Sequence, residues 1–170
     1  IKLVEHLREM TSSDVYALCD NYKKSCPKEG KHELLVHAIP HCGTEDCVKV
    51  ISDKLKGKPS ISRKLLSSLA FVSRPTSQML ADITPLVDTK YHAKGLLGVS
   101  SLVHNFCRYN SQCVDDNNFK NVMNKFKTLV SSCATTTGKE NVETMVTYLK
   151  SIGNVGHYEP MISVLSNCFK

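Results

Sequence analysis

The side chains of this sequence that could carry the most distinctive chemistry are those of its eight cysteines: Cys19, Cys26, Cys42, Cys47, Cys107, Cys113, Cys133 and Cys168. Their number is even, and six of them form three near-neighbour pairs, separated in chain order by six, four and five residues. Paired zinc ligands are commonly separated by only about two to four residues. The spacing therefore favours disulfides over a metal, and disulfides favour a secreted protein over a cytosolic one.

The other reactive side chains form no arrangement typical of an enzyme. His37 and His41 lie near Cys42, but no histidine pair has the glutamate-containing spacing of zinc proteases, and disulfides would consume the thiols. No serine lies in a glycine-flanked nucleophile turn. Asp115 and Asp116 are better placed to begin a helix, where carboxylates complement the helix dipole. We predict that the chain is not an enzyme and holds no metal or cofactor.

The densest basic tract of the chain is the second candidate for binding, and it comprises Lys54, Lys56, Lys58, Arg63 and Lys64. With a net charge of +6, such a tract can bind a sulfated glycan, an acidic receptor module or anionic lipid headgroups. The simpler interpretation is a solvated helix end. Aromatic residues are not interleaved with it, so we do not expect nucleic-acid binding. No apolar run reaches the ~20 residues of a membrane-spanning helix.

The elements that position these residues are predicted to be helices. Apolar residues recur at helical spacing before Cys26, over 29–39, from Thr44 to Leu55, 61–72, 79–87, 91–109 and 115–133, and no segment alternates with period two. Thr44 is a suitable N-cap, Pro85 should weaken the last turn of its helix, and Gly95 and Gly98 permit close approach of a neighbour. With 41% hydrophobic residues and no tryptophan, residues 1–170 can form one domain with a mostly aliphatic core.

The stretch from Cys133 to Cys168 contains two amphipathic patterns around a break. Gly153, Asn154 and Gly156 lie in this break, and both residue types tolerate the left-handed backbone of a helix C-cap. The stretch is therefore predicted to be a helix, a tight turn and an antiparallel helix. A row of short helices with short connections is typical of an α-solenoid, and a compact disulfide-stapled bundle is the competing architecture.

Three motifs resemble the large lipid transfer proteins, the family of vitellogenins, apolipophorins and apolipoprotein B. The first is the turn from Ala38 to Cys47, which contains Pro40-His41-Cys42-Gly43-Thr44; the second is Phe71-Val72-Ser73-Arg74-Pro75-Thr76; the third is Ile152-Gly153-Asn154-Val155-Gly156 after Leu149-Lys150. Their order and approximate distances along the chain also fit this family.

The resemblance implies an all-α fold, a right-handed α-α superhelix built as a two-layered solenoid of antiparallel helix pairs and stapled by disulfides. Residues 1–170 would be the N-terminal part of the α-helical domain, without the flanking β domains, and the start at Ile1 without a methionine agrees with a fragment. The resemblance also implies the pairs Cys42–Cys47 and Cys133–Cys168. The pairs Cys19–Cys26 and Cys107–Cys113 are assigned only by proximity.

The predicted function is therefore lipid transport, as a non-enzymatic structural segment that braces the lipid-binding cavity of a secreted lipoprotein. The resemblance is greatest to arthropod apolipophorin-like proteins, the kind that includes mite allergens. The partners it implies are lipids, the remaining domains of the same protein, and a lipoprotein receptor or sulfated glycan. The alternatives are a self-contained secreted disulfide-rich helical binding or defence protein, and a solenoid interaction module with free cysteines.

Overall fold

The computed structural model describes residues 2–11, 13, 14, 17, 43–56, 66–91, 93–134, 162 and 166. Throughout these residues the regular secondary structure is helical and contains no strand, which agrees with the predicted all-α class. None of the described helices is both long enough and apolar enough to cross a membrane. The core and the candidate sites described below all lie between residues 43 and 134.

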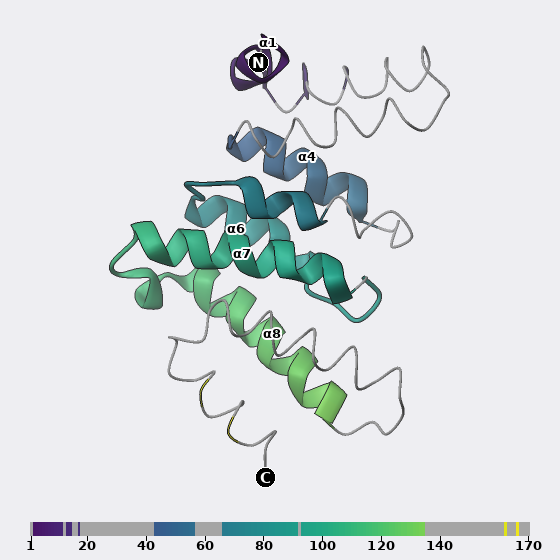
Figure 1. The fold of residues 1–170 in the computed structure, drawn as a ribbon, viewed down its shortest axis with the longest axis vertical. Coiled ribbons are helices and arrows are strands. Elements are labelled where there is room, and N and C mark those ends of the chain that lie inside the picture. Colours follow the sequence, from purple (N-terminus) through teal and green to yellow (C-terminus); the bar gives the residue numbers. More distant parts are fainter. Residues whose placement is uncertain are drawn as a thin grey trace.

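Figure 1 shows the described helices following one another along the long axis of the molecule. The α-helices are α1 (Lys2–Arg8), α4 (Glu45–Leu55), α6 (Ser77–Ile83), α7 (Ala93–Tyr109) and α8 (Asn117–Ala134), and the 3₁₀ turns are η2 (Leu69–Phe71), η3 (Thr84–Leu86) and η4 (Cys113–Asp115). Residues 66–68 are helical and lead directly into η2. The helices predicted over 91–109 and 115–133 are thus present, each beginning two residues later than expected.

The most extensive packing joins described elements that are not immediate neighbours in sequence. Helix α4 packs on α6, and α6 packs on α8, whereas η2 packs on α7. Alternate elements therefore form two sets, with α4, α6 and α8 in one and η2 and α7 in the other. Polar contacts add to this packing, because the buried Tyr91 hydroxyl donates to the Leu55 carbonyl at 3.1 Å and the Asn118 amide donates to the Ser77 hydroxyl at 2.9 Å.

Side-chain caps explain where three of these helices begin. Thr44 caps α4, with its hydroxyl oxygen accepting from the Cys47 N–H at 3.3 Å, as the sequence predicts. Thr76 caps α6 in the same way, accepting from the Met79 N–H at 3.4 Å. The Asp116 carboxylate accepts from the Phe119 N–H at 2.9 Å at the start of α8. Each cap satisfies a backbone donor that has no partner within its own helix.

Pro85 changes the end of α6 as predicted. The α-helix ends at Ile83, and Thr84, Pro85 and Leu86 form the 3₁₀ turn η3 instead. Proline has no N–H to donate and its ring clashes with the preceding turn, so the α-helix cannot continue through it. The Thr84 hydroxyl donates to the Leu80 carbonyl at 2.6 Å. This hydrogen bond satisfies a carbonyl at the end of the interrupted helix.

The core is mostly aliphatic, as the composition predicts. Its members come from α4, the 66–72 segment, α6, η3, α7 and α8, and the largest fully buried side chains are Phe119, Phe126, Ile51, Leu55, Leu66, Leu69, Met79, Leu80 and Ile83. Gly98 of α7 allows a close approach to a neighbouring segment, because a Cβ placed there would lie 1.9 Å from the Leu66 carbonyl oxygen. The prediction that Gly98 permits close helix packing is therefore confirmed.

Candidate functional site

The connection between α7 and α8 brings Cys107 and Cys113 together. Cys107 lies in the last turns of α7 and is partly buried, and Cys113 begins η4 and is buried. Both are free thiols in the structure, and the Cys113 side chain interacts with that of Cys107. Burial, followed by the hydrogen bond and charge of Cys113, raises the pKa of the Cys107 thiol far above its usual range. As a thiol, Cys107 is therefore a poor nucleophile at neutral pH.

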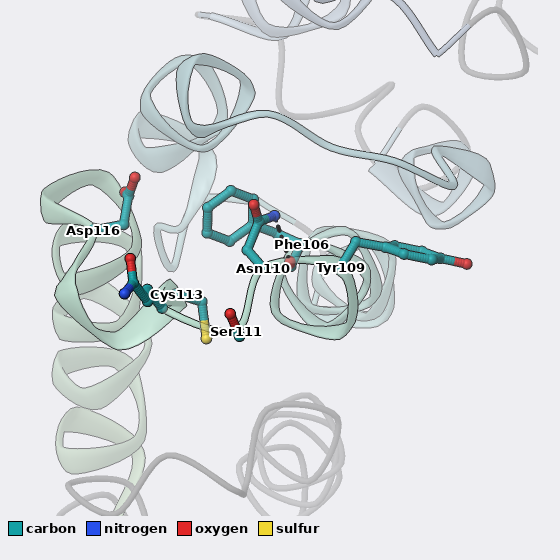
Figure 2. A pocket seen from close by; sticks show the side chains of 7 residues that line it. Phe106, Tyr109, Asn110, Ser111, Cys113 and Asp116 are labelled. Atoms are coloured by element: carbon teal, nitrogen blue, oxygen red, sulfur yellow. Dashed lines mark hydrogen bonds between the residues drawn. The ribbon is translucent and has the colours of Figure 1, made fainter.

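A small hollow of about 250 Å³ lies beside this connection and is lined by Phe106, Tyr109, Asn110, Ser111, Gln112, Cys113 and Asp116. The Asn110 amide donates to the Phe106 carbonyl at 2.8 Å, which satisfies a carbonyl near the end of α7. In Figure 2 the Asp116 carboxylate lies at the start of α8, and the Tyr109 ring points away from Cys113. The hollow holds no base paired with a nucleophile, so its side chains do not form a catalytic arrangement.

Asp116 is the carboxylate of this hollow, and its chemistry is that of a helix cap. Burial alone raises its pKa, but hydrogen bonds from Ser77 and from the N–H groups of Phe119 and Asn118, together with the Lys120 charge, lower the pKa overall. The fold thus stabilises the ionised form of the Asp116 carboxyl over the protonated form. The expectation that the Asp115–Asp116 pair begins a helix is confirmed for Asp116, whereas Asp115 ends η4.

Replacing Asp116 with alanine is expected to lower the free energy of unfolding by about 1 kcal/mol at pH 7, because the Phe119 N–H loses its acceptor. The pKa of Asp116 is lower in the folded protein than in the unfolded chain, where it is about 4. The Asp116 charge therefore stabilises the fold fully above the unfolded pKa, and this contribution is lost as the pH falls through the folded pKa. Urea unfolding of both proteins across this pH range tests the prediction, with Asp115→Ala as the matched control. An undiminished difference at acid pH would contradict a charge-dependent cap.

The turn before α4 contains the described part of the cysteine motif. Gly43 has a φ of +65°, in the left-handed region that favours glycine, and Thr44 follows it as the N-cap. Cys47 is completely buried in the first turn of α4. Cys42 lies outside the described residues, so the structure does not test the Cys42–Cys47 pair.

The remaining predicted cysteine and turn residues also lie largely outside the described part of the chain: Cys19, Cys26, Cys168, Gly153, Asn154 and Gly156. Cys133 lies within α8. Of the basic tract, Lys54 belongs to α4, and Lys58, Arg63 and Lys64 are outside the described residues. Lys56 is exposed and forms an ion pair with Asp53 at 2.9 Å, which raises the pKa of Lys56. The charge of this exposed lysine is therefore partly compensated by Asp53.

Among the described side chains, no group of three or more histidine, cysteine or carboxylate residues could hold a metal ion. His37 and His41, the histidines that the sequence places near Cys42, are not among those described. The prediction that the protein holds no metal stays a prediction.

One surface cluster was not found from the sequence. The guanidinium carbons of Arg74 and Arg108 lie 5.7 and 5.8 Å from the centroid of the Tyr109 ring, and all three side chains are exposed. Arg74 lies in the loop before α6, so its contact with Tyr109 depends on the packing of η2 on α7. No local sequence signal predicts this contact. We call these residues the Arg74–Tyr109–Arg108 cluster.

Comparison with known proteins places this helical array in a class. The model of the vitellogenin TPR domain matches residues 1–170, so the chain belongs to the vitellogenin TPR domain family. This match places it among the large lipid transfer proteins, as its three motifs suggest. Neither a curated protein nor a solved structure gave a significant match.

Proposed function

We propose that this chain is a non-enzymatic structural segment of a secreted lipid-carrying protein, in which it braces the lipid-binding cavity. The observation that carries the proposal is the match of the vitellogenin TPR domain to residues 1–170. A bracing role agrees with the described residues, which use their apolar side chains for a continuous helix-to-helix core. The candidate site beside α8 has capping and packing chemistry, which suits a scaffold.

The proposed architecture is a right-handed α-α superhelix with two layers of antiparallel helices. The packing of α4 on α6 and α6 on α8, with η2 on α7, supports it, since alternate helices of a two-layered solenoid lie in the same layer. Each pair of helices in such an array buries its apolar face only against neighbours. The array can therefore extend along a cavity wall without a central core.

Disulfides would staple this array in the secretory pathway, and the proposed pairs are Cys19–Cys26, Cys42–Cys47, Cys107–Cys113 and Cys133–Cys168. The contact between the Cys107 and Cys113 side chains supports the third pair. Its formation removes two protons and two electrons from the thiols, and a protein disulfide of an oxidoreductase accepts the electrons. Closing so short a loop contributes roughly 2 kcal/mol in the chain-entropy model.

Secreted protein is expected to yield a Cys107–Cys113 linked peptide after alkylation and digestion without reductant. The variant Cys107→Ala should lower the free energy of unfolding by about 2 kcal/mol. The double variant Cys107→Ala/Cys113→Ala should lower it by only slightly more, because both variants lose the same disulfide. Recovery of both cysteines in alkylated form from unreduced secreted protein would refute this pair.

The proposed subtype is an arthropod apolipophorin-like protein, the kind that includes mite allergens. It is supported by the Cys42-Gly43-Thr44 sequence, in which Gly43 supplies the left-handed residue and Thr44 the cap. A lipoprotein receptor or sulfated glycan is the proposed partner of the basic tract. The support for this partner is the local concentration of positive charge in the sequence.

An immunoblot with an antibody raised against the 170-residue chain tests the proposed setting. We expect the antibody to detect a protein much larger than 18.9 kDa in extracellular fluid, because the cavity walls must come from further domains. A reactive band near the mass of this chain in extracellular fluid would instead favour a self-contained secreted helical protein. A band confined to washed cells would overturn secretion.

A further inference from the structure

The Arg74–Tyr109–Arg108 cluster concentrates two positive charges around one exposed aromatic ring. Tyr109 is 54% exposed at the end of α7, and its ring points away from Cys113 (Figure 2). Because both guanidinium carbons lie within 6 Å of the ring centroid, they lie no more than about 12 Å from each other. The two cations are thus close enough to contact one short segment of a partner.

Within the part of the chain that the structure describes, both guanidinium groups contact the Tyr109 ring and neither is neutralised by a carboxylate. The described ion pairs are Lys56 with Asp53 and Lys90 with Asp88, and no described carboxylate pairs with Arg74 or Arg108. Arg108 lies in the last turn of α7, where a cation complements the helix dipole. Arg74 lies in a loop and has no such role. A guanidinium held at a ring keeps planar N–H donors suited to a carboxylate.

We propose that the Arg74–Tyr109–Arg108 cluster is a docking surface for an acidic segment of a partner protein. Arginine and tyrosine are, with tryptophan, the residue types enriched among the residues that contribute most to binding at protein interfaces. Here two guanidinium groups supply donors for adjacent carboxylates. The hollow that Tyr109 helps to line also contains Asp116, which disfavours a second carboxylate there. The acidic side chains are therefore placed at the arginines. This surface would bind the acidic segment whether or not the chain carries lipid.

Other anionic partners fit the cluster less well. Adsorption to an anionic bilayer typically uses clusters of about four to eight basic residues, and two arginines fall short of that number. Nucleic-acid stacking needs an aromatic face that is free for a base. The Tyr109 ring instead has two guanidinium groups near it.

The test is fluorescence anisotropy of a labelled glutamate-rich peptide with one phenylalanine, titrated with the 170-residue chain. The double variant Arg74→Gln/Arg108→Gln is expected to weaken binding more than about tenfold, since both charge-assisted contacts are lost. Lys125→Gln/Lys127→Gln removes the same charge from exposed positions of α8 and should change binding less than about twofold. Arg74→Lys/Arg108→Lys should bind at an intermediate level, because charge remains without the guanidinium fork. Circular dichroism confirms that each variant is folded.

Three results would overturn the proposal. The first is no binding of the peptide, and the second is equal weakening by the arginine and lysine double variants, which would show diffuse charge attraction. The third is arginine-dependent binding to vesicles of phosphatidylcholine and phosphatidylserine with no binding of the peptide. That result would assign the surface to lipid.

Discussion

Replacing Phe119 with alanine is expected to lower the free energy of unfolding by about 4 kcal/mol. Phe119 is completely buried near the start of α8, and its ring stacks with Phe106 of α7 at a centroid distance of 6.5 Å. The alanine would leave a cavity between two helices and remove an aromatic pair, so both the transfer of apolar surface and the packing are lost. Urea unfolding of the 170-residue chain, followed by circular dichroism, measures the change.

The matched control for Phe119→Ala is Phe71→Ala, because Phe71 of η2 is 56% exposed. This variant should lose much less stability than Phe119→Ala, since more than half of the Phe71 side chain is already in contact with water. Phe119→Leu should recover much of the lost stability by filling part of the cavity. Equal losses for Phe119→Ala and Phe71→Ala would contradict the position of Phe119 in the core.

Replacing Gly98 with alanine is expected to lower the free energy of unfolding by about 3 kcal/mol, although alanine is the better helix former by about 1 kcal/mol. The added Cβ would lie 1.9 Å from the Leu66 carbonyl oxygen and 2.6 Å from the Ser67 Cα. Both atoms belong to backbone, which cannot swing aside as a flexible side chain can. The two segments must therefore separate, and buried contacts of α7 are lost.

The control for Gly98→Ala is Asn121→Ala at an exposed position of α8. It introduces the same side chain into a helix and should change the free energy of unfolding by less than about 0.5 kcal/mol. Thermal unfolding of both variants compares them directly. A Gly98→Ala protein as stable as the parent would show that α7 does not pack as closely on the 66–67 segment as the structure indicates.

Local features of this fold were predictable because short-range rules determine them. The Thr44 cap needs only a hydroxyl three residues before an N–H, and Pro85 ends an α-helix wherever it lies. The burial of Phe119, Phe126 and the aliphatic side chains follows from helical periodicity. The close approach at Gly98 was inferred from the residue type, and the structure adds that its partner is the backbone at Leu66.

Features that depend on contacts between distant segments were not predictable. The Arg74–Tyr109 contact requires the position of η2 on α7, and the Tyr91–Leu55 hydrogen bond requires the position of the loop before α7. Among the cysteines, one pair was predictable from local sequence and another was not. Cys107 and Cys113 are close in sequence and also close in space, whereas sequence distance alone cannot pair Cys133.

Lipid analysis of the native protein shows whether this chain is part of a lipid carrier. The protein is captured from the extracellular fluid of its source with an antibody against this chain, washed without detergent, and extracted for mass spectrometry. A structural segment of a lipid-carrying protein predicts that phospholipid and neutral lipid co-purify in many copies per polypeptide, well above an unrelated captured protein. Capture of an extracellular protein that carries no lipid would contradict the account.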